Sequence, residues 1–344
     1  MIHGHGNEKN NYSHLIADFS SNVWYKGASK ELISVLSDSL ASIADYPEPD
    51  AGSLKRKIAN HYHLDKSNVL VSNGSTEAFY LIAQVYSGMK STIITPCFAE
   101  YADACNMHHH QVVTVSNTTK WQNFPFEEQL VWFANPNNPD GKTVSLKEIE
   151  QLLIVNPSSV FVLDEAYIEL CDSGETAIRL LVSYPNLIIV RSFTKTFSIP
   201  GIRLGYILSS RKIIDKISRF QIPWSINSIA LAAGNHIMEH YTELLPDTTM
   251  IKKESVALQH EIGSITQLKI YSSNCNFFLV QSLFRPACEL KELLINEFGI
   301  LIRDASNFNG LDAYFFRIAV QRPQMNKLLI KGIKQWIKTK NNSM

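Results

Sequence analysis

The chain contains little of what a disulfide scaffold, a membrane span or a polyanion-binding surface requires. Its five cysteines are scattered, odd in number and without a CxxC spacing, so reduced thiols in a cytoplasmic protein explain them better than disulfides or a zinc site. No apolar run approaches the length of a membrane-spanning helix. Lys plus Arg and Asp plus Glu number 32 each, so no overall field attracts nucleic acid or an anionic membrane. We therefore expect a cytoplasmic protein that has neither as a partner.

The sequence also shows neither a secretory signal nor a metal-binding motif. The segment Met1–Asn11 is polar and rich in His and Asn, so we expect no secretory signal there. The run His108–His110 offers imidazoles, but adjacent helical residues do not share a face, and no nearby Cys or acidic spacing completes a coordination shell. We predict a solvated loop at this run and no metal site.

What is present fits a globular protein of two domains. The 344 residues exceed the size at which one hydrophobic core usually keeps growing. Short apolar runs alternate with amphipathic stretches in the middle of the chain, which is typical of βαβ units and predicts an α/β fold with a mostly parallel sheet. We predict a large α/β domain at residues 40–240. Residues 1–39 and 241–344 should form an N-terminal arm and a small α+β domain.

The period of the apolar residues predicts the individual elements. Buried strands are expected at Ser91–Thr95, Gln111–Val115, Leu130–Ala134, Ser159–Leu163, Leu187–Val190 and Leu204–Leu208. Helices are expected at Ser75–Tyr86, Leu146–Leu153, Thr176–Val182, Ser225–His240 and Pro246–Ile262, the last linking the domains. The tail predicts strands at Lys269–Tyr271, Asn276–Val280, Ile300–Ile302 and Phe315–Val320, and helices at Cys288–Phe298 and Gln324–Lys338. In an open parallel sheet, ligands sit beyond the carboxyl ends of the strands, so the polar segments there are the candidate site.

The segment around Lys195 is the most specific of these. Lys195 is flanked by the hydroxyls of Ser192 and Thr194, and Arg203 follows eight residues later. An amine condenses with an aldehyde, while hydroxyls and a guanidinium hold a phosphate dianion, so the set suits a phosphorylated aldehyde. A solvated lysine in a Ser/Thr loop is the competing interpretation. We favour the site because other segments complete it.

Two further segments also follow buried strands. Asp164 ends an apolar strand, where its carboxylate would keep a pyridine nitrogen protonated, and Tyr167 would reach the phenolic oxygen of the same ring. The alternative is an acid that caps the next helix. Asn138 lies in the turn Asn135–Gly141, whose residues are turn formers in any protein. In such a site its amide would donate to the ring oxygen.

The remaining candidates have evenly matched alternatives. Ser75 and Thr76 open a helix after the run Val69–Val71, where free N–H groups favour a phosphate, although a plain helix cap explains them equally well. Phe98 follows a strand and would stack on a ring, or simply pack in the core. Arg317 lies inside an apolar strand, where it would clamp a carboxylate or extend to solvent.

Together these segments resemble the class I/II, fold-type I aminotransferases, which depend on pyridoxal 5′-phosphate (PLP), over almost the whole chain. The Lys-to-Arg spacing, the turn at Asn135–Gly141 and the Asp164–Tyr167 strand end resemble the histidinol-phosphate aminotransferase branch. Within it, several stretches look more like L-threonine-O-3-phosphate decarboxylases of cobalamin biosynthesis: His3–Gly6, Asp18–Asn22, Thr95–Tyr101, Gln221–Asn227 and Ile300–Asp312. The resemblance implies a large domain with a mostly parallel central sheet and a smaller α+β domain.

The resemblance also implies roles for single residues. Lys195 is the Schiff-base lysine and Asp164 the partner of the pyridinium; the other implied cofactor contacts are Tyr167 and Asn138 at the ring oxygen, Phe98 on the ring, and Ser75, Thr76, Ser192, Thr194 and Arg203 at the phosphate. Tyr46 is implied to reach the phosphate of a neighbouring subunit, which predicts a homodimer with shared sites. For the substrate, Arg317 is implied to bind the carboxylate, and Arg303, Asn22 and His3 or His5 its phosphate.

Two enzymatic activities and one other function remain open. The leading hypothesis is decarboxylation of a phosphorylated amino acid, with L-threonine O-3-phosphate giving aminopropanol phosphate. The alternative is transamination between histidinol phosphate, or another amino acid, and 2-oxoglutarate. The bond at Cα that stands perpendicular to the conjugated ring decides between them, and the motifs do not fix that orientation. A binding or regulatory module is a third hypothesis, but such proteins usually have an added DNA-binding segment or lack the lysine.

Overall fold

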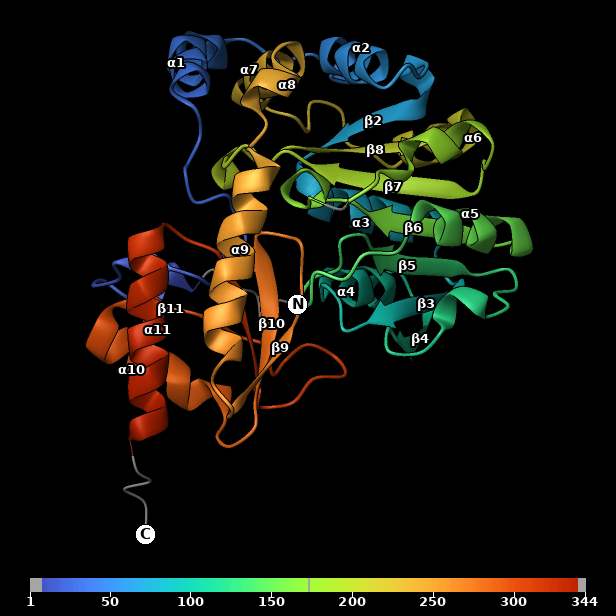
Figure 1. Ribbon diagram of the computed structural model, residues 1–344. Helices are drawn as coiled ribbons and strands as arrows, with labels where there is room; N and C mark the ends of the chain where they lie inside the picture. Colours follow the sequence, from blue (N-terminus) through green and yellow to red (C-terminus); the bar gives the residue numbers. More distant parts are fainter. Residues whose placement is uncertain (1–7, 173, 340–344) are drawn as a thin grey trace.

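The computed structural model describes residues 8–172 and 174–339. In this described part, the larger sheet has the strand order β2–β8–β7–β6–β5–β3–β4 and runs across one half of the molecule (Figure 1). Its strands are β2 (Val69–Ser72), β3 (Lys90–Thr95), β4 (Gln111–Ser116), β5 (Leu130–Ala134), β6 (Val160–Asp164), β7 (Leu187–Ser192) and β8 (Gly205–Ser209). β8 is antiparallel to both neighbours, and the pairs from β7 through β4 are parallel. The predicted α/β fold with a mostly parallel sheet is confirmed.

Helices cover both faces of this sheet, which explains why its central strands are continuous apolar runs. In β5, Leu130 and Trp132 pack in one core cluster, while Val131 and Phe133 pack in another. One face is covered by α3 (Gly74–Val85), α4 (Glu100–Met107) and α6 (Arg211–Ser218). The opposite face is covered by α2 (Gly52–His61), α5 (Leu146–Val155) and α7 (Ser228–Glu239), with α1 (Lys30–Asp38) packed on α7.

A smaller antiparallel sheet lies beside the large one, in the order β12–β13–β10–β9. Its strands are β9 (Leu268–Tyr271), β10 (Phe277–Ser282), β12 (Arg303–Asp304) and β13 (Phe315–Ala319). Its apolar face packs on α9 (Thr248–Gly263), α10 (Ala287–Phe298) and α11 (Pro323–Lys338). The N-terminal strand β1 (Ala17–Asp18) pairs with β11 (Ile300–Leu301), so the first described residues pack against this part. Figure 1 shows α9 running from the large sheet to the small one.

Short helices complete the described chain. They are η1 (Lys9–Asn11), η2 (Ser39–Ala44), η3 (Lys66–Asn68), η4 (Trp121–Asn123), η5 (Ile168–Leu170), η6 (Ala177–Val182), η7 (Pro200–Ile202) and α8 (Tyr241–Leu244). No helix among the described residues is both long and apolar enough to cross a membrane. The division at residues 40–240 stays a prediction.

Four local predictions need correction. Gln111–Val115 is not buried, because β4 is an edge strand with one neighbour. The predicted helix Thr176–Val182 is a 3₁₀ helix over Ala177–Val182, with Thr176 as its N-cap. Ile300–Ile302 is not one strand, since the chain passes from β11 to β12 there and so leaves one sheet for the other. His110 is not solvated: it is buried and hydrogen-bonds Ser91 Oγ at 2.8 Å and the Ala83 carbonyl at 2.8 Å.

Candidate active site

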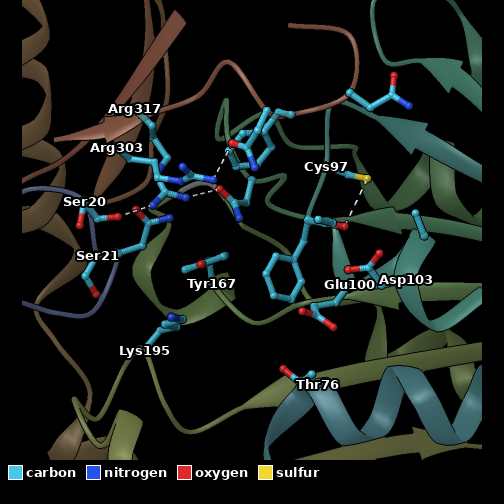
Figure 2. Close-up of a pocket in the computed structure, with 18 of the residues that line it drawn as sticks. Ser20, Ser21, Thr76, Cys97, Glu100, Asp103, Tyr167, Lys195, Arg303 and Arg317 are labelled. Atoms are coloured by element: carbon cyan, nitrogen blue, oxygen red, sulfur yellow. Dashed lines mark hydrogen bonds between the residues drawn. The ribbon is translucent and has the colours of Figure 1, made fainter. Parts of the chain in front are cut away.

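A cavity of about 630 Å³ lies where the carboxyl ends of the large sheet meet the small sheet. Thr95, Asn138, Tyr167 and Lys195 enter it from segments that follow β3, β5, β6 and β7 or end them. Figure 2 shows Arg303 and Arg317 on the wall that belongs to the small sheet, with Tyr167 between them and Lys195. The topology thus gathers residues far apart in the sequence into one site.

Lys195 lies three residues after the end of β7, in a loop that is held by hydrogen bonds to the segment around Trp24. The Trp24 N–H donates to the Lys195 carbonyl at 3.0 Å, and Ser198 Oγ donates to the Trp24 carbonyl at 2.7 Å. Burial lowers the pKa of the Lys195 amine to about 8, and the positive charges of Arg317 and Arg203 act in the same direction. A larger fraction of the amine is therefore neutral, and nucleophilic, near neutral pH than for an ordinary lysine.

This lowered pKa has a direct test in protein freed of bound small molecules. Competitive labelling with an amine-reactive reagent, read by mass spectrometry, should give half-maximal reactivity of Lys195 near pH 8. The exposed Lys147 is an internal reference for the reagent in the same digest. Half-labelling of Lys195 above pH 10, in the ordinary range of lysine, would contradict this electrostatic description of the site.

Asp164 ends β6 and is buried behind the cavity rather than lining it. Its carboxylate accepts a hydrogen bond from the Tyr101 hydroxyl at 2.5 Å and one from the Ala166 N–H at 2.9 Å. Burial raises the pKa of Asp164 to about 6, although both hydrogen bonds oppose this shift and so does the charge of Lys195. The acid therefore lacks a full counter-charge, and a cation placed beside it would favour its ionised form.

The N-terminus of α3 forms a cradle next to Arg203. Gly74 has φ +80°, a backbone conformation that favours glycine, and a Cβ there would lie 2.7 Å from Arg203 Nη2, so glycine also leaves room for the guanidinium where it lies. A Cβ on Gly205 would lie 2.7 Å from the Ser75 nitrogen, so β8 also packs closely on the first turn of the helix. Free N–H groups at a helix start beside a guanidinium attract an anion.

Arg317 is buried in β13 and oriented by two acceptors. Its Nη1 donates to Asn138 Oδ1 at 2.5 Å, and its Nη2 donates to the Ser20 carbonyl at 2.5 Å. Since Asn138 Oδ1 accepts from the arginine, the Asn138 amide N–H₂ is directed away from it and remains a donor for the cavity. Burial lowers the pKa of Arg317 to about 10, so bringing an anion to it would recover part of the lost solvation.

Arg303 lies opposite Arg317 in the antiparallel pair of β12 and β13. Paired residues project from the same face of a sheet, so both guanidinium groups line the cavity. Arg303 Nη2 donates to Asn307 Oδ1 at 2.7 Å, and its guanidinium lies 5.3 Å from the ring centre of Phe308. The loop with Asn307 and Phe308 therefore holds the Arg303 guanidinium in position.

Asn22 is 1% exposed and lines the cavity beside Tyr167. Neither polar atom of its carboxamide meets strict hydrogen-bond geometry with a described residue, although the amide lies close enough to Tyr167 to act on the pKa of that hydroxyl. A buried amide that faces a cavity and is at most weakly hydrogen-bonded is suited to bind a polar ligand.

The structure brings most of the predicted site residues together. The cavity is lined by Asn22, Thr76, Phe98, Asn138, Tyr167, Thr194, Lys195, Arg203, Arg303 and Arg317. Ser75, Asp164 and Ser192 lie behind this lining, where they adjoin the cradle or the end of the sheet. Tyr46 lies elsewhere on the surface, 88% exposed and with its ring 5.8 Å from that of Trp224. His3 and His5 lie outside the described residues.

Sequence reasoning missed several residues that orient this site. Tyr101, Ser20 and Asn307 hold Asp164, Arg317 and Arg303 respectively. Tyr101, Ser20 and Asn307 all stand inside stretches singled out for other reasons, but a single hydrogen bond to the side chain of another residue leaves no spacing signal in the sequence. The cluster around Arg191, described below, was missed as a unit, although Glu165 lies in the Asp164–Tyr167 strand end.

Comparison with known proteins places this geometry in a family. A family model described as aminotransferase class I and II matches residues 9–333. A putative threonine-phosphate decarboxylase of Caldanaerobacter subterraneus is 31% identical over 307 residues, covering 85% of this chain and 83% of that protein. An adenosylcobalamin biosynthesis bifunctional protein of Leptospira interrogans is 30% identical over 92% of this chain, but the chain spans only 38% of its length. A histidinol-phosphate aminotransferase of Ruminiclostridium cellulolyticum is 28% identical, covering 83% of this chain and 82% of that protein.

Solved structures of the same two kinds of enzyme are also similar to this chain. L-threonine-O-3-phosphate decarboxylase from Porphyromonas gingivalis superposes with a TM-score of 0.89 and 35% identity, covering 94% of this chain and all of that one. Histidinol-phosphate aminotransferase from Clostridium acetobutylicum gives a TM-score of 0.83 and 26% identity, covering 93% and 98%. Both therefore share the overall fold of this chain.

Proposed function

The chain belongs to the aminotransferase class I and II family, and on that premise we propose that it binds PLP and decarboxylates L-threonine O-3-phosphate to aminopropanol phosphate, a step of cobalamin biosynthesis. It is an enzyme of one of the two classes that its relatives name, decarboxylases and aminotransferases. Its fold is that of the fold-type I PLP-dependent transferases.

The residues of the site fit PLP in three independent ways. The cradle of Gly74, Ser75, Thr76 and Arg203 suits a phosphate dianion. A largely buried amine at Lys195 suits an aldehyde, and a buried acid without a full counter-charge at Asp164 suits a ring cation. When bound, PLP supplies an electron-withdrawing ring that accepts the electron pair of a bond broken at the Cα of an attached amino acid.

In this proposal the protein fixes the cofactor through side chains on every side. Lys195 forms the covalent link and later moves a proton at Cα, and Asp164 holds a proton on the ring nitrogen. The other contacts we assign are Tyr167 and Asn138 at the ring oxygen, Phe98 on the ring face, and Ser192, Thr194, Ser75, Thr76 and Arg203 at the phosphate.

The observation that carries the choice of substrate is the pair of guanidinium groups on one wall. Arg303 and Arg317 project from paired positions into one cavity, so they suit a small molecule with two anionic groups. A phosphorylated amino acid has a carboxylate for Arg317 and a phosphate for Arg303 and Asn22. Contacts at both ends would fix the orientation of the substrate about Cα. Decarboxylation would follow if they hold the Cα–carboxylate bond perpendicular to the conjugated system of the cofactor.

Product analysis separates this proposal from the alternative, transamination of histidinol phosphate with 2-oxoglutarate. Purified PLP-loaded protein should release CO₂ from L-threonine O-3-phosphate without any keto acid, and Arg303→Gln should raise KM for this substrate. L-threonine without phosphate is the control, which should be a poor substrate because it lacks the anionic group that Arg303 would bind. Glutamate formed from histidinol phosphate, with threonine phosphate inert, would replace the proposal by the alternative. If neither CO₂ nor glutamate forms, both proposed activities are refuted.

We also propose that the protein is a cytoplasmic homodimer in which each subunit contributes residues to the active site of the other. Tyr46, Ile43 and Ile222 are 88%, 71% and 73% exposed, with Leu40 and Trp224 also exposed nearby in sequence. Apolar side chains grouped on a surface favour a protein partner, and a second copy would bring Tyr46 toward the neighbouring phosphate cradle. The free thiols of all five cysteines support the cytoplasmic assignment.

A further inference from the structure

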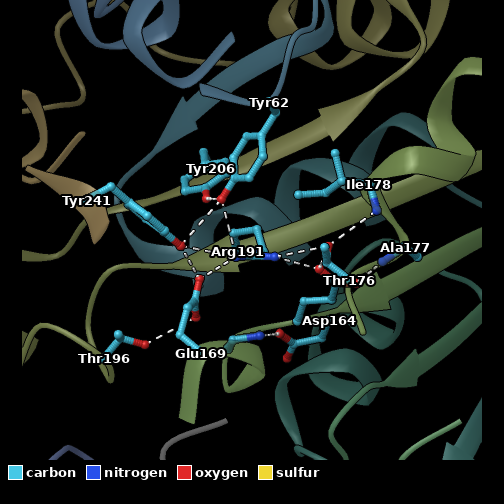
Figure 3. Close-up of polar contacts among 12 residues, drawn as sticks. Tyr62, Asp164, Glu169, Thr176, Ala177, Ile178, Arg191, Thr196, Tyr206 and Tyr241 are labelled. Carbon is cyan, nitrogen blue, oxygen red and sulfur yellow. Dashed lines mark hydrogen bonds and ion pairs between the residues drawn. The ribbon is translucent and has the colours of Figure 1, made fainter. Parts of the chain in front are cut away.

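A second charged cluster is buried next to the cavity and is not part of its lining. Arg191, in β7, is 3% exposed, and its Nη1 donates to Glu165 Oε2 at 2.7 Å. Its Nη2 forms an ion pair with Glu169. One guanidinium therefore bridges two carboxylates in the interior of the protein (Figure 3).

Hydroxyl groups complete this cluster. Glu165 accepts from Thr176 Oγ1 at 2.7 Å, and Glu169 accepts from the Tyr241 hydroxyl at 2.6 Å. The Tyr62 hydroxyl accepts from Arg191 Nη2 at 3.3 Å and hydrogen-bonds Tyr206 at 2.8 Å. We call these residues the Arg191 cluster: Arg191, Glu165, Glu169, Thr176, Tyr62, Tyr206 and Tyr241. Burying three charges is expensive, and apolar residues of similar volume often stabilise a core better, so stability alone is a weak explanation.

The cluster contacts the chain next to both groups that the proposed chemistry needs. Glu165 directly follows Asp164 in the sequence. Glu169 accepts a hydrogen bond from Thr196 Oγ1 at 3.2 Å, and Thr196 directly follows Lys195. Through Arg191, the end of β6 that carries Asp164 is thereby joined to the loop that carries Lys195.

We propose that the Arg191 cluster is a positioning device for Lys195 and Asp164, and that the Thr196–Glu169 hydrogen bond is its link to the lysine loop. The proposal rests on the proposed function, because Lys195 and Asp164 are the two residues that would hold PLP, and the cluster would fix the distance between them. The Trp24 N–H holds the Lys195 carbonyl, so the Thr196 link restrains the loop at a second point.

The consequence of loosening this link is specific. The phosphate cradle and the two arginines of the substrate wall are not part of the cluster, so PLP affinity and substrate KM should change little. The orientation of the cofactor relative to Asp164 should become less uniform, and kcat should fall, since small misplacements of reacting groups cost rate. A purely structural role would lower stability without this selective loss.

Thr196→Val tests the proposal because it keeps the shape of the side chain and removes the hydroxyl. Thr196→Ser restores the hydroxyl and is the rescue variant. Thr92→Val is the matched control: Thr92 is buried in β3 and its hydroxyl donates to Gln129 Oε1 at 2.5 Å, away from Lys195 in the chain. All three are compared as PLP-loaded full-length protein by thermal melting, visible circular dichroism of the bound cofactor, kcat and KM.

We expect Thr196→Val to retain PLP, to lose visible dichroic amplitude, and to have a kcat about tenfold to 100-fold lower at nearly unchanged KM. Thr196→Ser and Thr92→Val should match the unchanged protein in PLP content, visible dichroism, kcat and KM. If Thr196→Val binds PLP and shows the dichroism and kcat of the unchanged protein, the positioning proposal is overturned while the proposed function stands. If the unchanged protein binds no PLP, the proposed function fails, and the positioning proposal fails with it.

Discussion

Lys195→Ala should abolish the covalent attachment of PLP and lower kcat by about 10⁴-fold, the upper end of what positioned acid–base groups contribute. Two functions are lost together, because the same amine forms the link to the aldehyde and moves a proton at Cα in our proposal. Borohydride reduction followed by mass spectrometry measures the link directly, since it fixes a pyridoxyl group on the lysine. The unchanged protein should be labelled at Lys195 and the variant should not be labelled.

The phosphate cradle gives this experiment its internal check. Gly74, Thr76 and Arg203 are untouched by the substitution, so the variant should still retain PLP without a covalent bond. Lys147→Ala, at an exposed position on α5, is the matched control and should behave as the unchanged protein. A pyridoxyl group on another lysine of the active unchanged protein would overturn the assignment of Lys195 as the residue that holds the cofactor.

The site residues at the carboxyl ends of the large sheet could be predicted best from the sequence. Lys195, Asp164 and Asn138 each follow a continuous apolar run, and the carboxyl ends of parallel strands must meet at one edge. The topology alone therefore places them near each other, whatever their chemistry. Their individual roles at the cofactor stay predictions.

The parts that sequence reasoning missed depend on contacts between distant residues. In the Arg191 cluster, Tyr62 and Tyr241 are 179 positions apart, and their hydroxyl groups lie 3.5 Å apart. Each alone resembles an ordinary core aromatic, because nothing local distinguishes a tyrosine that binds a buried charge. The error at β4 has a different origin: Val112, Val113 and Val115 suit any strand, and only the sheet order decides whether a strand is central or at the edge.

Asp164→Asn is the second substitution for which we expect a large effect, a fall in kcat of about 10³-fold. The amide has nearly the same shape, but it is neutral and cannot hold a proton on the ring nitrogen, so the ring withdraws electrons less strongly. Tyr101→Phe is the comparison variant, since it removes the hydroxyl that donates to Asp164 but leaves the carboxylate in place. Its kcat should fall far less. Equal losses in both variants would show that packing, rather than the charge, is what matters.

The dependence on pH provides an independent test of the same charge. Burial raises the pKa of Asp164 to about 6 from an ordinary 3.8, so the folded PLP-free protein binds this proton more tightly than the unfolded chain does. The contribution of Asp164 to stability is therefore full below pH 3.8 and is lost as the pH rises toward 6. A ring cation beside the ionised acid offsets this loss, so the rise in Tm caused by PLP should increase between pH 5 and pH 7. The Asp164→Asn variant would bind the same cofactor phosphate but has no acid at this position. The increase of the PLP-induced rise in Tm between pH 5 and pH 7 should therefore be smaller in this variant. An equal increase in both proteins would show that a group other than Asp164 titrates.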